Sequence, residues 1–179
     1  MYEIIPKRTN KAAEYVASIM IVTAFLAMFF TTLPSLPYRS VMQLAAMVML
    51  AFSILMITRY TLSAYSYAVI SADVSGEFDF TVTELKRKSH ITVCRISLSS
   101  IEKVALVKAS DKKLSAKLKA SAKSRKRFNY CIDVAPSQYI YLFAEECGER
   151  IALKLSYDKK LYSILKEAAA RNTQSNSED

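Results

Sequence analysis

Two long stretches of the chain carry no charged side chain. The first covers residues 15–38 and the second covers residues 40–58, with Arg39 alone between them. At ~1.5 Å of rise per residue, helices over residues 15–33 and 40–58 would each reach about 28 Å, close to the ~30 Å hydrocarbon core of a bilayer. Each stretch is apolar all round, whereas a surface helix of a soluble protein normally keeps a polar stripe. The pattern therefore predicts two membrane-spanning helices within residues 15–59.

The link between the predicted spans is short and contains Pro34 and Pro37. Proline cannot continue a helix, and so short a link makes the two helices antiparallel neighbours. Gln43 in the second span is expected either to hydrogen-bond across the pair or to a partner subunit, or to lie at the membrane interface. Small side chains would let the two backbones approach closely. They are Ala17, Ser18 and Ala24 in the first span and Ala45, Ala46, Ala51 and Ser53 in the second.

Two other interpretations compete with a spanning hairpin. A helix pair buried in a soluble core would show polar positions, which runs such as residues 19–22 and 47–50 lack. A cleaved signal peptide could begin with the basic residues near Lys7, but its apolar region would be too long and no small-residue cleavage site follows. Because a second apolar stretch comes at once, we predict an uncleaved signal anchor.

A regular alternation of apolar and polar residues replaces these stretches after residue 60, which is typical of half-buried strands. Three segments in succession, residues 61–72, 78–82 and 91–95, predict an antiparallel meander with turns at residues 75–77 and 86–89. In the third segment Ile91, Val93 and Arg95 alternate with Thr92 and Cys94. Four further strands are expected over residues 101–107, 128–134, 139–144 and 150–155.

A helix is predicted to end the folded part of the chain. Asp158 is expected to cap it, Leu161, Leu165 and Ala168 fall on one face, and the helix should end near Arg171. The polar residues 172–179 are predicted to be disordered.

About seven antiparallel strands followed by one helix is the element order of a pleckstrin-homology-like (PH-like) barrel, in which the helix fills an open end. Two N-terminal spans, a strand meander, the phrase from Leu98 to Val104 and a closing helix over residues 158–170 resemble the bacterial membrane-anchored PH-like proteins of the YcxB-like kind. The likeness covers nearly the whole chain through element order and this one phrase. It implies a PH-like fold and a membrane location, and it brings no catalytic residues.

The predicted fold class is an α+β membrane protein, with an N-terminal two-helix transmembrane hairpin followed by an antiparallel PH-like β-barrel or sandwich and a C-terminal capping helix. Its parts are a flank at residues 1–14, the hairpin at 15–59, a β domain at 60–171 that contains a basic insert at 111–127, and a tail at 172–179.

The basic residues beside the spans predict the orientation. Lys7, Arg8 and Lys11 precede the first span, and Arg59 follows the second, whereas the link holds one arginine. By the positive-inside rule both termini and the β domain are cytoplasmic, in a multi-pass protein of the cell membrane. The three cysteines are an odd number without framework spacing, which suits a reducing compartment.

The formal charge of +9 is concentrated in one block. Residues 86–127 hold fourteen Lys or Arg against two acids, whereas residues 60–85 hold four acids and no base. The pattern of residues 111–127, the densest part, fits a helix and a strand equally well. Its basic residues are Lys112, Lys113, Lys117, Lys119, Lys123, Arg125, Lys126 and Arg127.

This basic block cannot lie far from the membrane, because Arg59 directly follows the second span. Anionic headgroups attract each Lys or Arg by about 1 kcal/mol when it lies within a Debye length of ~8–10 Å. We therefore expect the eight basic residues to bind anionic phospholipid or an acidic protein partner. The alternative is a solvated insert that keeps a loop from aggregating. Headgroup-specific recognition is not expected, since the first strand hairpin is acidic.

Other functional classes receive less support. Nucleic acid is an unlikely partner, because aromatic residues are not interleaved with the basic ones. The chain has one histidine, three cysteines without metal-ligand spacing and two glycines, so neither a metal site nor a phosphate-binding glycine loop is expected. We predict a protein without enzymatic activity or cofactor: an interaction module, or a small accessory subunit of a larger transporter or signalling complex, with homo- or hetero-oligomers through the spans.

Overall fold

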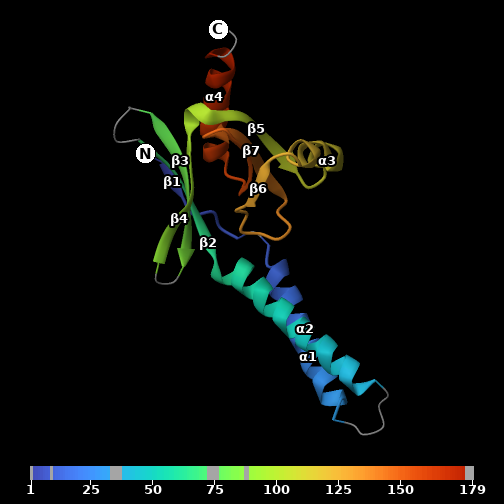
Figure 1. Cartoon of the computed structure of the whole chain (residues 1–179). Helices are drawn as coiled ribbons and strands as arrows, with labels where there is room; N and C mark the ends of the chain where they lie inside the picture. The colour runs from blue at the N-terminus through green and yellow to red at the C-terminus, as the bar shows by residue number, and fades with distance from the viewer. Residues whose placement is uncertain (1, 9, 33–37, 72–76, 87–88, 176–179) are drawn as a thin grey trace.

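The computed structural model describes residues 2–8, 10–32, 38–71, 77–86 and 89–175 (Figure 1). The predicted link between the spans and the centres of the first two predicted strand turns lie outside these residues. The elements are β1 (Tyr2–Ile4), α1 (Ala12–Phe30), α2 (Arg39–Ile57), a π-helical turn (Thr58–Leu62), β2 (Ala64–Ser71), β3 (Phe78–Lys86), β4 (Ser89–Ser97), a 3₁₀ turn (Leu98–Ser100), β5 (Ile101–Lys108), α3 (Lys112–Ser121), β6 (Lys126–Asn129), β7 (Gln138–Glu146), β8 (Glu149–Ser156) and α4 (Lys159–Ser175).

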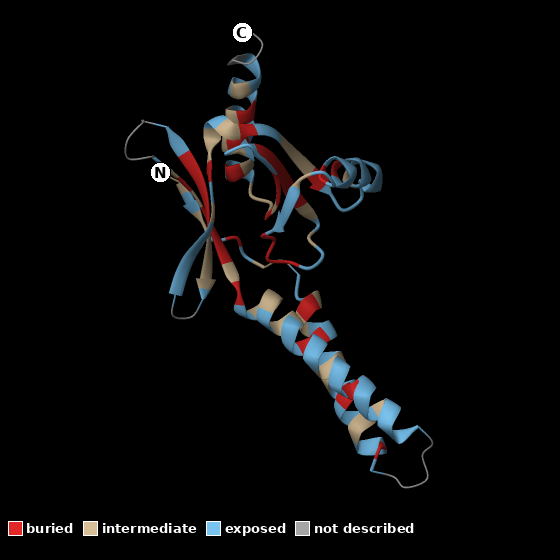
Figure 2. Cartoon of the chain, in the orientation of Figure 1, coloured by how far each residue is buried: buried red, intermediate tan, exposed pale blue. Residues whose placement is uncertain are grey.

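Helices α1 and α2 lie side by side and project from the rest of the chain as an extended hairpin (Figure 1). Both are long and apolar enough to cross a membrane: α1 has 19 residues and a mean hydropathy of 1.9, and α2 with the π-helical turn has 24 residues and a mean hydropathy of 2.2. Only 11% of each apolar stretch is buried, and the outer faces of the hairpin are exposed (Figure 2). The prediction of two helices of spanning length is therefore confirmed.

Small side chains form the contact between the two helices. Ala17 and Ala24 on α1 face Ala46 and Ser53 on α2, and all four are buried at seven-residue spacing within each helix. Three other predicted contact residues, Ser18, Ala45 and Ala51, are exposed. Gln43 is also exposed on α2.

The strands form two separate sheets of four strands each in the described part of the chain. The first has the order β1-β2-β3-β4 and is antiparallel throughout. The second has the order β5-β7-β8-β6, and β6 pairs with β8 in parallel. The two sheets do not form a closed barrel, so the barrel alternative of the prediction is wrong, and the expectation of antiparallel strands throughout is wrong for β6, which pairs with β8 in parallel after the α3 excursion.

Strand β1 belongs to the β domain although it precedes the hairpin. Tyr2 pairs with Val69 and Ile4 pairs with Tyr67, so β1 is the edge strand beside β2. The hairpin is thus inserted between two neighbouring strands of one sheet. The predicted domain boundaries are wrong here, since residues 2–4 are not part of a separate flank.

One hydrophobic core lies between the two sheets, and α4 packs into the same core (Figure 2). Asp158 caps α4, since its carboxylate accepts the backbone N–H of Leu161 over 2.8 Å. The helix continues to Ser175, so the predicted disordered tail is wrong for residues 172–175, and residues 176–179 lie outside the described part. The largest fully buried members of this core include Tyr67, Phe80, Ile140, Leu142, Leu153 and Leu165.

Strand β4 turns a different face to the core than its sequence pattern predicts. Cys94 and Ile96 point inward, while Ile91 and Val93 are exposed. The register between β3 and β4 shifts between Val82, which pairs with Cys94, and Thr83, which pairs with Thr92, so the alternation of Ile91 and Val93 does not continue into Cys94 and Ile96. Of the predicted strand at residues 128–134, only residues 128 and 129 are in a strand, at the end of β6.

Candidate functional site

The basic insert is a helix that covers the outer face of the second sheet. Leu118 and Ala122 are buried against the aromatic row Tyr139, Tyr141 and Phe143 of β7. These rings alternate with the residues of β7 that face the main core, so β7 is buried on both sides. The apolar spacing of four residues suits a helix on this aromatic surface, which resolves the alternative that the sequence left open.

Lysines occupy the exposed face of α3. Lys112, Lys113, Lys117, Lys119 and Lys123 are all exposed. Within the part of the chain that the structure describes, none of them has a carboxylate within ion-pair distance. At 100° per residue, Lys112 and Lys119 share one flank of α3, and Lys113 and Lys117 share the other. Lys123 lies in the turn that follows the helix.

Arg125 behaves differently from the lysines. Its guanidinium donates to the Glu102 carboxylate over 2.8 Å and lies 5.3 Å from the centre of the Phe143 ring. Only 16% of the side chain is exposed. Arg125 therefore fastens the end of the α3 segment to the second sheet, and it is not available for a partner.

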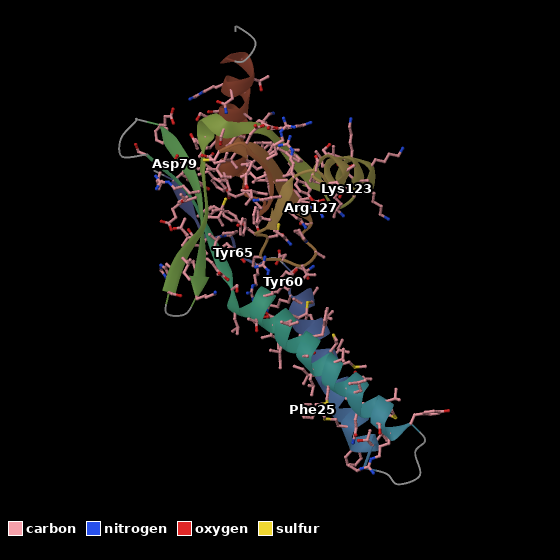
Figure 3. The ribbon with its side chains drawn as sticks, in the orientation of Figure 1. Phe25, Tyr60, Tyr65, Asp79, Lys123 and Arg127 are labelled. Carbon is pink, nitrogen blue, oxygen red and sulfur yellow. The ribbon has the colours of Figure 1, made fainter. Side chains whose placement is uncertain are left out.

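The next two predicted residues lie on β6. Lys126 pairs with Glu149 at the surface, where an exposed pair contributes about 0–1 kcal/mol and leaves the lysine free to exchange partners. Arg127 is exposed, and Figure 3 places it on the same side of the domain as Lys123. We call the four lysines of α3, together with Lys123, Lys126 and Arg127, the basic surface.

Arg59 joins the hairpin to both sheets, a role that the sequence analysis missed. Its guanidinium donates to the Tyr65 hydroxyl on β2 and to the Asn129 carbonyl at the end of β6. The guanidinium also lies 5.2 Å from the centre of the Tyr65 ring. Figure 3 shows Tyr60 and Tyr65 at this junction. The position of an arginine directly after a long apolar stretch was the only signal in the sequence.

The start of α1 is fastened to the domain as well. Arg8 donates to the Thr61 carbonyl over 2.7 Å and pairs with Glu14 over 3.3 Å. The side-chain amide of Asn10 donates to the Ala135 carbonyl over 3.3 Å. Both ends of the hairpin are therefore attached to the β domain, which fixes where the hairpin points relative to the basic surface.

The hairpin leans toward the side of the domain on which α3 lies. In Figure 1 the free end of α4 and strand β1 are on the opposite side.

Among the described residues, Cys131 is buried, Cys94 is half-buried and Cys147 is exposed. Burial raises the pKa of the Cys94 and Cys131 thiols to about 11, so both stay protonated and unreactive at neutral pH. His90 is exposed on β4. No group of three or more His, Cys, Asp or Glu among the described residues could hold a metal ion.

We expect the domain to lose stability between pH 9 and 11. The folded-state pKa of Cys131 lies above its ordinary value of 9.0, so its contribution to the free energy of unfolding is complete below about pH 9 and disappears as pH rises through the folded-state value. The loss attributable to this thiol is at most about 2–3 kcal/mol. Urea unfolding across this range should be less pH-dependent for Cys131→Ala. An equal slope in the variant would contradict the assignment.

Comparison of the chain with protein-family models, with curated proteins and with solved structures gave no significant match. The resemblance to YcxB-like proteins therefore stays a prediction.

Proposed function

We propose that this protein is a non-enzymatic, membrane-anchored interaction module whose basic surface docks on anionic lipid headgroups. The hairpin crosses the cell membrane, and the β domain stands on the cytoplasmic face. The observation that carries the proposal is a set of exposed lysines that form no ion pair with any described residue, on and directly after a helix that apolar packing fixes to the domain, on the side toward which the hairpin leans.

The attachment of the hairpin supports this placement. Because β1 and β2 are neighbours in one sheet, both ends of the hairpin must lie on the same side of the membrane as the β domain. Lys7, Arg8 and Lys11 lie at that end, which favours the cytoplasmic side. Exposed Tyr15 near this end and exposed Tyr38 at the other suit the two interfaces of a bilayer, where aromatic residues collect.

We propose a PH-like fold, in the broad sense, for the β domain. Two sheets enclose one core, and a C-terminal helix packs against it. The parallel strand β6 and the excursion through α3 are departures from a simple antiparallel barrel. Strand β6 and the α3 excursion carry the basic surface. We therefore assign the function to the region that departs from the expected fold.

Charge and distance favour a lipid surface over nucleic acid. Each basic residue near an anionic leaflet contributes about 1 kcal/mol, and the attraction falls off within ~8 Å at physiological salt. The lysines of α3 point away from the aromatic row beneath them, so bases of a nucleic acid would find no rings to stack on there.

Lysine acetylation in lipid nanodiscs tests the docking. In the full chain, the α3 lysines are expected to react several-fold more slowly in discs with anionic phosphatidylglycerol than in discs of phosphatidylcholine, because the headgroups cover them. The protection should disappear near ~1 M salt, where the Debye length falls to ~3 Å. Mass spectrometry of the labelled peptides gives each rate, and Lys159 and Lys166 on α4 serve as internal controls.

A charge variant gives the matched comparison. Replacing Lys112, Lys119 and Lys123 with Gln should weaken docking about 100-fold at ~1 kcal/mol per lysine, and Lys117 should then lose its protection. Replacing Lys159, Lys166 and Arg171 with Gln removes the same charge from α4 and should change nothing. Equal labelling of α3 in the two kinds of disc would refute the proposal.

A further inference from the structure

The connection between β6 and β7 is held against the base of the hairpin at two points. Arg59, at the end of the second candidate span, donates to the carbonyl of Asn129. The backbone N–H of Asn10, just before α1, donates to the Asp133 carboxylate over 3.4 Å. The connection therefore lies beside both ends of the hairpin.

An exposed apolar residue is the chain neighbour of each of the two residues that make these contacts. Phe128, next to Asn129, is 42% exposed, and Val134, next to Asp133, is 40% exposed. The Phe128 ring is fixed, because it stacks on the Tyr130 ring with 6.1 Å between ring centres and 3° between planes. Two apolar side chains thus face outward at the base of the hairpin, one beside each helix end.

The place of Arg59 determines what these side chains meet. Arg59 is the first charged residue after the apolar stretch of α2, so its backbone lies at the edge of the hydrocarbon region if the hairpin spans the membrane. The headgroup layer beyond that edge is roughly 5–7 Å thick. Asn129 accepts a hydrogen bond from the Arg59 guanidinium, and Phe128 is the neighbouring residue, so Phe128 lies within one arginine side chain and one residue of this edge.

We infer that Phe128 and Val134 insert at the boundary between lipid headgroups and acyl chains and form an apolar foot for the β domain. The inference rests on the proposed membrane span and deepens it by adding a contact that does not depend on lipid charge. The occupant is the bilayer interface itself, because the foot is continuous with the attached ends of the two spans.

The absence of tryptophan from the chain provides the test. Phe128→Trp introduces a single indole into the full chain, which is then placed in nanodiscs of phosphatidylcholine brominated near the headgroup end of its acyl chains. We expect emission at shorter wavelength and strong quenching by the brominated lipid, equal at ~0.15 M and ~1 M salt. Val134→Trp is a second, independent probe and should behave in the same way.

Two further single-tryptophan variants separate the possible outcomes. Phe78→Trp places the indole at the start of β3, next to Asp79 and away from the hairpin, at a site of similar exposure, and it should stay unquenched (Figure 3). Phe25→Trp lies within α1 and should be quenched wherever the foot lies. Quenching at residue 25 without quenching at 128 and 134 would overturn the foot and leave the span intact. No quenching at residue 25 would overturn the span itself. Short-wavelength emission at residue 128 without quenching would show that the indole contacts protein in place of lipid, and it would overturn the foot.

Discussion

A chain that begins at residue 60 is expected to be about 3–5 kcal/mol less stable than a chain in which residues 2–8 are joined by a four-residue turn to residues 63–175. Only the second keeps β1. Without this strand the domain loses the partly buried Tyr2 and Ile4, three backbone pairs and the hydrogen bond of 2.7 Å from the Tyr2 hydroxyl to Asp158. The join is short enough, because Arg8 donates to the Ser63 carbonyl over 3.4 Å.

Urea unfolding followed by circular dichroism measures this difference, since neither shortened chain contains the apolar hairpin. The predicted loss is a large share of the 5–15 kcal/mol that stabilises an ordinary domain, so the shorter chain should be partly unfolded or aggregated. Tyr2→Phe in the joined chain isolates the hydrogen bond to Asp158 and should lose only a part of the difference. Equal stability of the two chains would show that β1 is dispensable.

Arg59→Ala should lower the stability of the full chain by about 2–4 kcal/mol, because one guanidinium makes three contacts that span both sheets. Two are hydrogen bonds, to Tyr65 and Asn129, and the third is the stacking on the Tyr65 ring. Lysine has no planar fork, so Arg59→Lys should recover less than half of the loss. In mild detergent the expected fall in Tm for Arg59→Ala is roughly 5–12 °C.

Arg39→Ala is the matched control for this variant. It removes the same side chain from the other end of α2, where Arg39 is exposed, and it should shift Tm by at most about 1–2 °C. A Tm for Arg59→Ala as high as that of Arg39→Ala would mean that the junction does not depend on Arg59.

The sequence alone predicts the elements whose pattern is long or repeated. Apolar stretches of spanning length give α1 and α2, and the alternation along residues 139–144 and 150–155 gives β7 and β8. The cap at Asp158 and the spacing of Leu161 and Leu165 give α4, with an error only at its end. The basic residues of the candidate site were also readable, because charge needs no knowledge of the fold.

The remaining features depend on contacts between distant residues. Strand β1 is three residues long, too short to show a period, and it forms only because β2 offers an open edge. Strand β6 is short and basic and pairs in parallel with β8, which a local pattern does not encode. Arg125 looked like its neighbours in the sequence, yet Glu102 and Phe143 hold it inward, and only the fold brings those two residues to it.

The insertion of the hairpin between β1 and β2 has a consequence for how the protein is made. Strand β1 leaves the ribosome before β2 and, if the hairpin spans a membrane as we propose, stays unpaired until both helices have been inserted and β2 has been synthesised. If only one helix crossed, β1 and β2 would be stranded in different compartments, and the first sheet could not form. Completion of this sheet would therefore act as a check on correct insertion, and misinserted copies would expose an open strand edge to proteolysis.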